Sequence, residues 1–304
     1  MRKFVAFTGY ACNNRCGFCV HLNRRTLPPR TLREVAVALA AARRGGADYV
    51  EFVGGEVSIR RDFLDLLALA RGLGFSRVAV ATNGRLFARP GFARNAVEAG
   101  LTDAMVSLHG DTEELHDGLV DSPGAFKALL AGVAALQEAG VGRLSANTAV
   151  VRPNVPALAS IARLLLSFGL RQAEFIFVDP TVGGAADDMD RWVPRLSEAA
   201  PAMRAALAAG RDAGTSEWCV RYVPLCLFRD WLGQVSELRE ARAFSGVAHW
   251  APDFENPDVA GSRRESARVR PARCAGCRLE PQCEGLWKPY AERYGGAELE
   301  PVYG

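Results

Sequence analysis

Three cysteines near the start of the chain, Cys12, Cys16 and Cys19, are the residues whose type and spacing point most directly to chemistry. They form a Cys-x3-Cys-x2-Cys motif, which puts three thiolates on one short loop. Thiolates are the usual ligands of iron–sulfur clusters, and three of them on a four-iron cubane leave one iron open to another ligand. A structural zinc ion would need four closed ligands, and His21 is the nearest candidate for the fourth. The motif therefore predicts a [4Fe–4S] cluster with one open iron.

The eight cysteines of this 304-residue chain fall into groups. The composition of the chain indicates the kind of chemistry in which they take part. No apolar run reaches the ~18 residues of a membrane span, and no signal sequence precedes the first strand pattern. We therefore expect a cytoplasmic protein, in which disulfides are rare and close-spaced cysteines indicate metal or redox chemistry. The net charge of +3 is too small to indicate nucleic-acid binding. Neither a membrane nor a nucleic acid is an expected partner.

Apolar stretches alternate with helical ones over the first two-thirds of the chain, which is the pattern of βα units on a parallel sheet. Strands are predicted over 3–8, 49–53, 77–82, 104–108, 144–151 and 174–178, and helices over 31–44, 60–73, 92–99, 123–139 and 156–168. Thr31 and Glu34 have the spacing of a helix capping box. Six such units fit a partial barrel or an open doubly wound sheet, and periodicity alone does not separate the two. In both folds the site residues belong at the carboxyl ends of the strands.

The composition changes after the sixth predicted strand. Residues 179–190 are polar and rich in glycine, an alanine-rich helix is predicted near 194–210, and a strand-like piece over 217–223 leads to Cys226. We therefore place a domain boundary near residue 212. The sequence predicts a larger α/β domain over 1–211 and a smaller domain over 212–304.

Together with further motifs in the same order, the N-terminal cysteine motif resembles the radical SAM superfamily over roughly residues 3–180. Gly54-Gly55-Glu56 looks like the family's GGE motif, which binds the amino group of S-adenosylmethionine (SAM), although Val57-Ser58 replaces the usual Pro-Thr. Glycines let the backbone approach a ligand closely, and a carboxylate complements a cation. The other positions that match SAM-contacting residues of the family are Phe18, Thr82, Asn83, Ser107 and Asn147. The resemblance implies an α/β fold with a partial (β/α)6 TIM-like barrel.

A second group of three cysteines, near the end of the chain, indicates a further metal site. Its members are Cys274, Cys277 and Cys283. Cys226 is the preferred fourth ligand and Cys219 the alternative, and zinc would satisfy the same geometry. Beside the N-terminal motif, the pattern resembles the SPASM and twitch auxiliary-cluster domains, although Trp287 stands where a last cysteine would follow. This resemblance implies one fully ligated auxiliary [4Fe–4S] cluster, suited to electron transfer or structure.

The resemblance also implies a reaction type. SAM is cleaved to a 5′-deoxyadenosyl radical, which abstracts a hydrogen atom from a substrate carbon, with a reductase, flavodoxin or ferredoxin as electron donor. The remaining thiol, Cys219, is a candidate hydrogen-atom donor, which favours epimerisation, although a free cysteine is equally often a buried apolar side chain. Dehydrogenation of an alcohol, with the auxiliary cluster as electron acceptor, is the first alternative. Modification of a ribosomally made peptide is the second, and a non-catalytic iron–sulfur or zinc-binding module is the alternative outside enzymes.

Two features favour a small polar substrate, such as a sugar or aminocyclitol of the kind found in antibiotic biosynthesis. The first cluster motif begins at residue 12, which leaves no room for an N-terminal peptide-recognition domain. Four aspartates also follow the sixth predicted strand, where the mouth of the site is expected, and carboxylates there could hold ammonium groups. They are Asp179, Asp187, Asp188 and Asp190. The plainer interpretation of these acids is a solvated loop.

Overall fold

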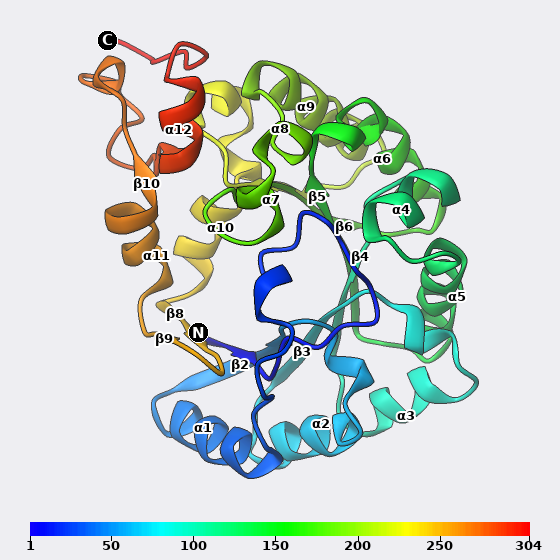
Figure 1. Ribbon diagram of the computed structural model, residues 1–304. Coiled ribbons are helices and arrows are strands. Elements are labelled where there is room, and N and C mark those ends of the chain that lie inside the picture. Colours follow the sequence, from blue (N-terminus) through cyan, green and yellow to red (C-terminus); the bar gives the residue numbers. More distant parts are fainter.

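The computed structural model describes residues 1–304 as an α/β fold around one sheet of nine strands, ordered β7-β6-β5-β4-β3-β2-β1-β8-β9. The strands are β1 (Arg2–Phe7), β2 (Ala47–Val53), β3 (Arg77–Thr82), β4 (Asp103–Ser107), β5 (Arg143–Val150), β6 (Gln172–Phe177), β7 (Glu217–Arg221), β8 (Gly246–Trp250) and β9 (Glu255–Asn256). All neighbouring pairs are parallel except β8–β9. Because consecutive strands lie side by side from β1 to β7, the sheet curls into a barrel (Figure 1). Its two edges, β7 and β9, do not pair, so the barrel is open.

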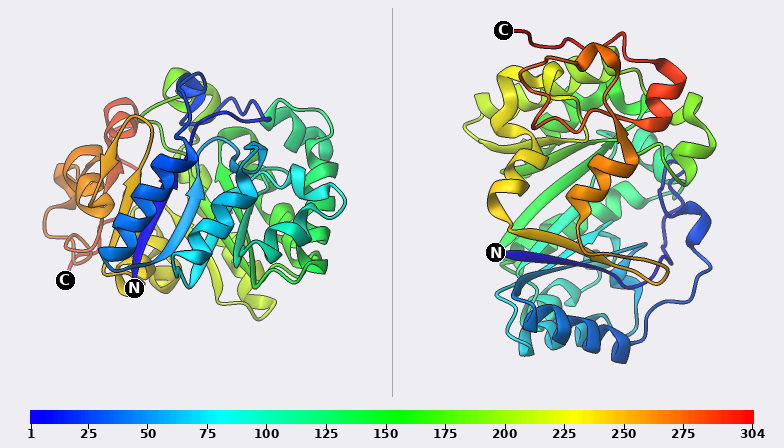
Figure 2. Two further views of the ribbon diagram at one scale, coloured as in Figure 1. Left: turned by 90° about the horizontal axis from the view of Figure 1, so that it is seen from below. Right: turned by 90° about the vertical axis from the view of Figure 1, so that its left-hand side faces the viewer.

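The helices form an outer layer around this barrel (Figures 1 and 2). They are α1 (Leu32–Arg44), α2 (Phe63–Gly72), α3 (Phe92–Glu98), α4 (Glu113–Val120), α5 (Ala125–Glu138), α6 (Leu158–Ser167), α7 (Gly184–Asp187), α8 (Met189–Trp192), α9 (Leu196–Asp212), α10 (Ser236–Ala243), α11 (Val259–Ser262) and α12 (Lys288–Tyr294). One continuous cluster of buried apolar side chains lies between the layers and includes Val50 of β2 and Leu66 of α2. Two short strands, β10 (Arg268–Val269) and β11 (Leu286–Trp287), form a separate antiparallel pair.

The strands and helices predicted from periodicity are present, with ends shifted by a few residues at most. The strand order decides the alternative that periodicity leaves open. Consecutive strands are neighbours from β1 to β7, without the reversal of order that a doubly wound sheet has, and the fold is a partial barrel. The capping box of α1 is also confirmed. The Glu34 N–H donates to the Thr31 hydroxyl at 3.2 Å, and the Thr31 N–H donates to the Glu34 carboxylate at 2.8 Å. Periodicity does not predict α4 or the short strand β8.

The segment after residue 212 contributes strands to the barrel itself. The strand-like piece over 217–223 is β7, which pairs with β6, and β8 pairs with β1. The later residues, with α11, β10 and α12, lie beyond β8 and β9 on one side of the barrel (Figures 1 and 2). The boundary predicted near residue 212 coincides with the end of α9 and precedes three strands of the nine-stranded sheet, β7, β8 and β9. The division into two domains stays a prediction.

No single helix combines the length and the apolar composition needed to cross a membrane. The helices α4 and α5 satisfy both criteria only when taken together, and they are bent by 102° relative to one another.

Candidate active site

The loop after β1 carries Cys12, Cys16 and Cys19, and all three line one cavity at the carboxyl ends of the strands. We call the segment that follows β1 and contains these three cysteines the cysteine loop. The cavity has a volume of about 420 Å³. Burial raises the pKa of Cys16, and the charges of the neighbouring Cys19 and Cys12 raise it further. Backbone N–H groups donate to two of the sulfurs, from Asn14 to Cys12 at 3.3 Å and from His21 to Cys19 at 3.4 Å. Such bonds stabilise the thiolate form that a metal cluster needs.

Gly54 and Gly55, directly after β2, lie against the backbone of the cysteine loop. The Gly55 N–H donates to the carbonyl oxygen of Gly9 at 3.0 Å, and the Glu56 N–H donates to that of Ala11 at 2.8 Å. A Cβ on Gly54 would lie 2.1 Å from the Gly9 oxygen, and one on Gly55 would lie 2.1 Å from the Ala11 oxygen. Gly54 also has a φ of +140°, which side-chain-bearing residues avoid. The glycine pair therefore allows the cysteine loop to pack directly on the end of β2.

Replacing Gly55 with alanine is expected to displace the cysteine loop, because the added methyl group would lie 2.1 Å from the Ala11 oxygen and 2.4 Å from that of Tyr10. Overpacking of this kind costs about 1–3 kcal/mol of unfolding free energy. We expect a lower midpoint in denaturant unfolding and less iron bound after anaerobic reconstitution. Gly72→Ala is the matched control, since a Cβ at Gly72 meets nothing within 4 Å. Equal losses in both variants would contradict this explanation.

The Glu56 carboxylate is buried and joins three of the predicted SAM-binding residues into one hydrogen-bonded unit. Its Oε1 accepts from the Ser58 hydroxyl at 2.6 Å and the Thr82 hydroxyl at 2.7 Å, and its Oε2 accepts from the Asn83 N–H at 2.6 Å. Burial raises the pKa of Glu56, and these hydrogen bonds oppose that shift. Glu56, Thr82 and Asn83 all line the same cavity as the cysteine loop. The structure thus brings the GGE motif and the end of β3 together beside the three sulfurs.

Cys219, the predicted hydrogen-atom donor, does not lie in this cavity. It is the central residue of β7 and pairs in register with Glu174 on β6. Its side chain lines a second pocket of about 350 Å³ at the amino ends of the strands, together with Lys3 and Asp103. We call this the basal pocket. The two pockets lie at opposite ends of the barrel and share no residue, so Cys219 lies outside the cavity in which the hydrogen-atom donor was expected.

The remaining predicted SAM contacts lie at different depths in the barrel. Phe18 and Ser107 line the cavity. Asn147 on β5 pairs in register with Ser107 on β4 but is not among the cavity-lining residues. Two residues before it, Ser145 lines the basal pocket, and two residues after it, Ala149 lines the cavity. Since alternate residues of a strand share a face, Asn147 faces the barrel interior between the two spaces.

Four cysteines of the C-terminal half line one small pocket. They are Cys226, Cys274, Cys277 and Cys283. Burial and the charges of the other three thiols raise the pKa of Cys274 to about 11. Two of the sulfurs accept backbone hydrogen bonds, Cys283 from Leu225 at 3.5 Å and Cys277 from Val302 at 3.3 Å. No group of three or more His, Cys, Asp or Glu side chains in the chain is placed to hold a single metal ion. The pocket thus gathers Cys226, rather than Cys219, with the three C-terminal cysteines.

Of the four aspartates after β6, only Asp179 lines the cavity. Its Oδ1 accepts from the N–H and the hydroxyl of Thr181, at 2.8 and 2.6 Å, and burial raises its pKa. The other three are exposed and bound elsewhere: Asp187 accepts from Asn23, Asp188 accepts from the Arg191 N–H, and Asp190 pairs with Arg293. Of the four aspartates expected at the mouth of the site, only Asp179 therefore contributes a carboxylate to the cavity.

Arg25 and Tyr222 are among the cavity-lining residues that were not predicted from the sequence. The Arg25 guanidinium donates to the Asn14 carbonyl oxygen at 2.7 Å and so braces the cysteine loop. Tyr222 directly follows β7, which places it at the carboxyl end of a barrel strand. The strand predicted over 217–223 extends past Tyr222, so the prediction does not place Tyr222 at the end of a strand. A strand ending at residue 221 would have identified Tyr222 as a site residue.

The first part of the chain matches a known family. Residues 7–164 match the Radical SAM superfamily, a span that contains the cysteine loop, Gly54-Gly55-Glu56 and Asn147. The AdoMet-dependent heme synthase of Oleidesulfovibrio alaskensis is 31% identical over 176 residues, which cover 56% of this chain and 44% of that protein. The GTP 3',8-cyclase of Edwardsiella ictaluri is 34% identical over 151 residues, which cover 46% of this chain and 44% of that protein. The matched region spans less than half the length of these relatives.

Solved structures match nearly the whole chain. Streptococcus suis SuiB bound to S-adenosylmethionine has a TM-score of 0.71 at 13% identity, and the match covers 96% of this chain and 74% of SuiB. Native anSMEcpe with bound AdoMet has a TM-score of 0.67 at 13% identity, and the match covers 100% of this chain and 93% of that protein. At this level of identity the likeness concerns the fold.

Proposed function

The chain belongs to the radical SAM superfamily, and we propose that its cysteine loop holds the [4Fe–4S] cluster at which SAM is cleaved. The observation that carries this proposal is the convergence of three thiols on one cavity lined by Gly54, Gly55 and Glu56. When bound, the cluster supplies the electron that breaks a C–S bond of SAM. The fourth iron has no protein ligand in this set, so the amino and carboxylate groups of SAM can bind it.

Different residues around the cysteine loop are suited to bind different parts of SAM. We propose that Glu56 receives the amino group, because its buried carboxylate complements a cation. Phe18 borders the adenine, and Ser107 and Asn147 hold the ribose and carboxylate, as the family resemblance implies. Thr82 and Asn83 act through Glu56, since both donate hydrogen bonds to its carboxylate.

We propose that Cys226, Cys274, Cys277 and Cys283 hold an auxiliary [4Fe–4S] cluster. The shared pocket of the four thiols supports this, as do the backbone N–H groups that donate to two sulfurs, because hydrogen bonds to sulfur tune iron–sulfur sites. Four protein ligands leave no iron open to a substrate. The auxiliary cluster therefore suits electron transfer or a structural role.

We propose a small polar substrate with amino groups, such as an amino sugar or an aminocyclitol. Asp179 supports this class, because it lines the cavity and its Oδ2 makes no hydrogen bond with the protein. A free carboxylate oxygen can accept a charge-assisted hydrogen bond from an ammonium group. The cavity of about 420 Å³ must also hold SAM, which limits the reacting part of the substrate to a small group.

Within this class we propose epimerisation. The 5′-deoxyadenosyl radical removes a hydrogen atom from one face of a substrate carbon, and an X–H group of the protein returns one to the other face. Dehydrogenation of an alcohol and modification of a peptide are the alternatives. The peptide alternative is retained because SuiB bound to the precursor peptide SuiA and anSMEcpe bound to a Cp18Cys peptide have this fold, with TM-scores of 0.71 and 0.68.

An anaerobic assay in D2O tests this proposal with reconstituted enzyme, SAM, dithionite and a panel of amino sugars, aminocyclitols and short peptides. Epimerisation predicts 5′-deoxyadenosine whose formation depends on the substrate, and a product that carries one solvent deuterium on carbon. A product lighter by two hydrogens would indicate dehydrogenation, and activity confined to peptides would indicate peptide modification. If no 5′-deoxyadenosine formed under any condition, SAM cleavage by this chain would be refuted.

Asp179→Asn is expected to raise the KM for an aminated substrate roughly 10- to 100-fold, because a hydrogen bond to a charged group contributes about 1.5–3 kcal/mol. Burial raises the pKa of Asp179, so the wild-type KM should rise as the pH falls through that raised pKa and the carboxylate gains a proton. The asparagine variant should lack this pH dependence. Asp187→Asn, at an exposed residue bonded to Asn23, is the control and should leave the KM unchanged. Identical pH profiles for wild type and Asp179→Asn would exclude Asp179 from substrate binding.

A further inference from the structure

Tyr222 occupies a strained backbone position on the wall of the cavity. It directly follows β7 and has a φ of +65°, and Asp121 is the only other non-glycine residue with a positive φ. A bulky residue in the left-handed region costs about 1–3 kcal/mol and persists only where its surroundings impose it. Such positions cluster in active sites. The strain therefore points to a functional side chain.

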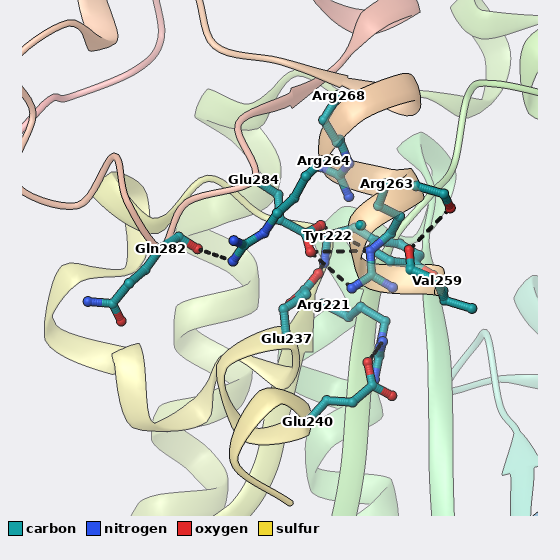
Figure 3. Close-up of polar contacts among 12 residues, drawn as sticks. Arg221, Tyr222, Glu237, Glu240, Val259, Arg263, Arg264, Arg268, Gln282 and Glu284 are labelled. Atoms are coloured by element: carbon teal, nitrogen blue, oxygen red, sulfur yellow. Dashed lines mark hydrogen bonds and ion pairs between the residues drawn. The ribbon is translucent and has the colours of Figure 1, made fainter. Parts of the chain in front are cut away.

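One glutamate and three arginines hold Tyr222 in this position (Figure 3). Its N–H donates to the Glu237 carboxylate at 2.6 Å. The guanidinium carbons of Arg221, Arg263 and Arg268 lie 5.7, 5.7 and 5.2 Å from the centre of its ring. Each distance is within the range of a cation–π contact. The ring is thus flanked by cations from β7 and from the C-terminal segment.

Buried carboxylates anchor two of these arginines in turn. Arg263 binds Glu284 through two N–H groups, at 3.0 and 2.9 Å, and both side chains are less than a tenth exposed. Arg221 pairs with Glu174 at 2.8 Å and with Glu240 at 3.3 Å. Paired buried charges hold a fixed geometry, because breaking either pair would leave an uncompensated charge. The ring of Tyr222 therefore has little freedom to move, and its hydroxyl takes no part in this network.

Two tyrosines line the cavity, and their hydroxyl groups differ. The Tyr10 hydroxyl bonds to Asp253 at 2.5 Å, and its side chain is fully buried. Tyr222 also lines the cavity, and its hydroxyl makes no hydrogen bond with the protein. Burial raises the pKa of Tyr222, so its phenol keeps the proton at neutral pH. Tyr222 thus combines an intact and unengaged O–H bond with a position on the cavity wall.

We propose that Tyr222 is the hydrogen-atom donor that quenches the substrate radical, an inference that rests on the proposed epimerisation. The cysteine loop follows β1 and Tyr222 follows β7, the two ends of the run β1–β7 in the sheet. Both also border the same cavity, so a substrate held there can meet the adenosyl radical and the phenol in turn. Epimerisation requires that hydrogen leaves one face of the substrate carbon and returns to the other.

The step balances in atoms and electrons. The phenolic O–H bond breaks homolytically, a C–H bond forms on the substrate, and Tyr222 becomes a neutral tyrosyl radical. One electron from the one-electron reductant that supports SAM cleavage and one proton from solvent restore the phenol. The substrate is neither oxidised nor reduced, as epimerisation requires.

Tyr222→Phe tests the donor, because this change removes the O–H group and keeps the ring and its arginine contacts. The assay is free of substrate and of added thiol and contains SAM and dithionite in D2O, so that the exchangeable phenol of Tyr222 carries deuterium. We expect 5′-deoxyadenosine from the wild type to carry deuterium at C5′ and that from Tyr222→Phe to lose most of it, at equal iron content. Tyr303→Phe, at an exposed tyrosine, and Cys219→Ala should match the wild type. Equal deuterium in wild type and Tyr222→Phe would overturn the proposal.

The panel of amino sugars and aminocyclitols separates this inference from the proposed function. Tyr222→Phe should still form 5′-deoxyadenosine in response to the substrate but lose the deuterated epimer, and a freeze-quenched tyrosyl signal should occur only in enzyme that retains Tyr222. A deuterated epimer formed by Tyr222→Phe at the wild-type rate would refute the donor and leave epimerisation intact. If the wild type made no epimer from any compound, epimerisation would fail. The substrate-free comparison would then decide whether Tyr222 gives up its hydrogen atom.

Discussion

Replacing Cys16 with alanine is expected to abolish SAM cleavage and to remove about four irons per chain, the content of one cubane. Cys16 lies between the other two ligands of the cysteine loop, and its charge interacts with both. Two thiolates cannot hold the cluster against loss to solvent. Iron determination after anaerobic reconstitution and quantification of 5′-deoxyadenosine measure the two effects. SAM cleavage retained in Cys16→Ala would contradict the assignment of the cysteine loop.

His21→Phe is the control for the zinc alternative at this loop. His21 is the histidine nearest to the three cysteines, and its ring stacks on Tyr10 at 4.6 Å, a contact that phenylalanine can keep. A [4Fe–4S] cluster on three cysteines predicts that His21→Phe retains its iron and its SAM cleavage. A site that bound zinc, and lost it in His21→Phe, would instead indicate a four-ligand structural ion.

Replacing Cys226 with alanine is expected to remove about four irons, those of the proposed auxiliary cluster, and to leave the proposed cluster of the cysteine loop in place. Cys226 shares a pocket with the three C-terminal cysteines, far from the cysteine loop in sequence. We expect SAM cleavage without substrate to persist in Cys226→Ala, whereas productive turnover is lost. Iron content and electron paramagnetic resonance of the reduced protein distinguish the two clusters.

Cys219→Ala is the matched variant for this experiment, since both residues were candidates for the fourth ligand. Cys219 lines the basal pocket, so its replacement should leave the iron content at the wild-type value. A loss of iron in Cys219→Ala with full content in Cys226→Ala would reverse the assignment.

The order of most strands and helices could be predicted from sequence, because these strands are short apolar runs and these helices have apolar residues at helical spacing. The choice of a barrel over an open sheet came from the family resemblance and not from periodicity. The GGE motif was likewise recognisable at the end of a strand. Its packing role was not, because the contact of Gly54 and Gly55 with the cysteine loop joins two segments distant in sequence. The residue types alone indicated only that another group approaches the backbone of Gly54 and Gly55 closely.

The position of Cys219 shows what residue spacing cannot tell. The sequence places it in a strand close to Cys226, and closeness in sequence suggested closeness in space. Along an extended strand, however, the three residues from Cys219 to Tyr222 span about 10 Å. That length separates the basal pocket from the cavity. Because β7 runs from the basal pocket toward the cavity, Tyr222 rather than Cys219 lies where we propose that the substrate binds.

For a related reason, the sequence did not predict which carboxylates of the loop after β6 would line the cavity. Composition shows that four carboxylates lie near the mouth of the barrel but not where each one points. Short helices turn Asp187, Asp188 and Asp190 outward, toward local hydrogen bonds and an ion pair. Asp179 precedes those turns and stays on the cavity wall.

The pairing of β1 with β8 has a consequence for how the protein is made. The cysteine loop leaves a strand whose second neighbour is β8, and Tyr10 and Arg30 at its borders bond to Asp253 and Ala251, which lie 243 and 221 residues later. A ribosome delivers the loop long before these partners exist. Contacts at such sequence separation also form late in folding. We therefore expect the cysteine loop to reach its final position, and to bind its cluster stably, only after the last third of the chain has been synthesised.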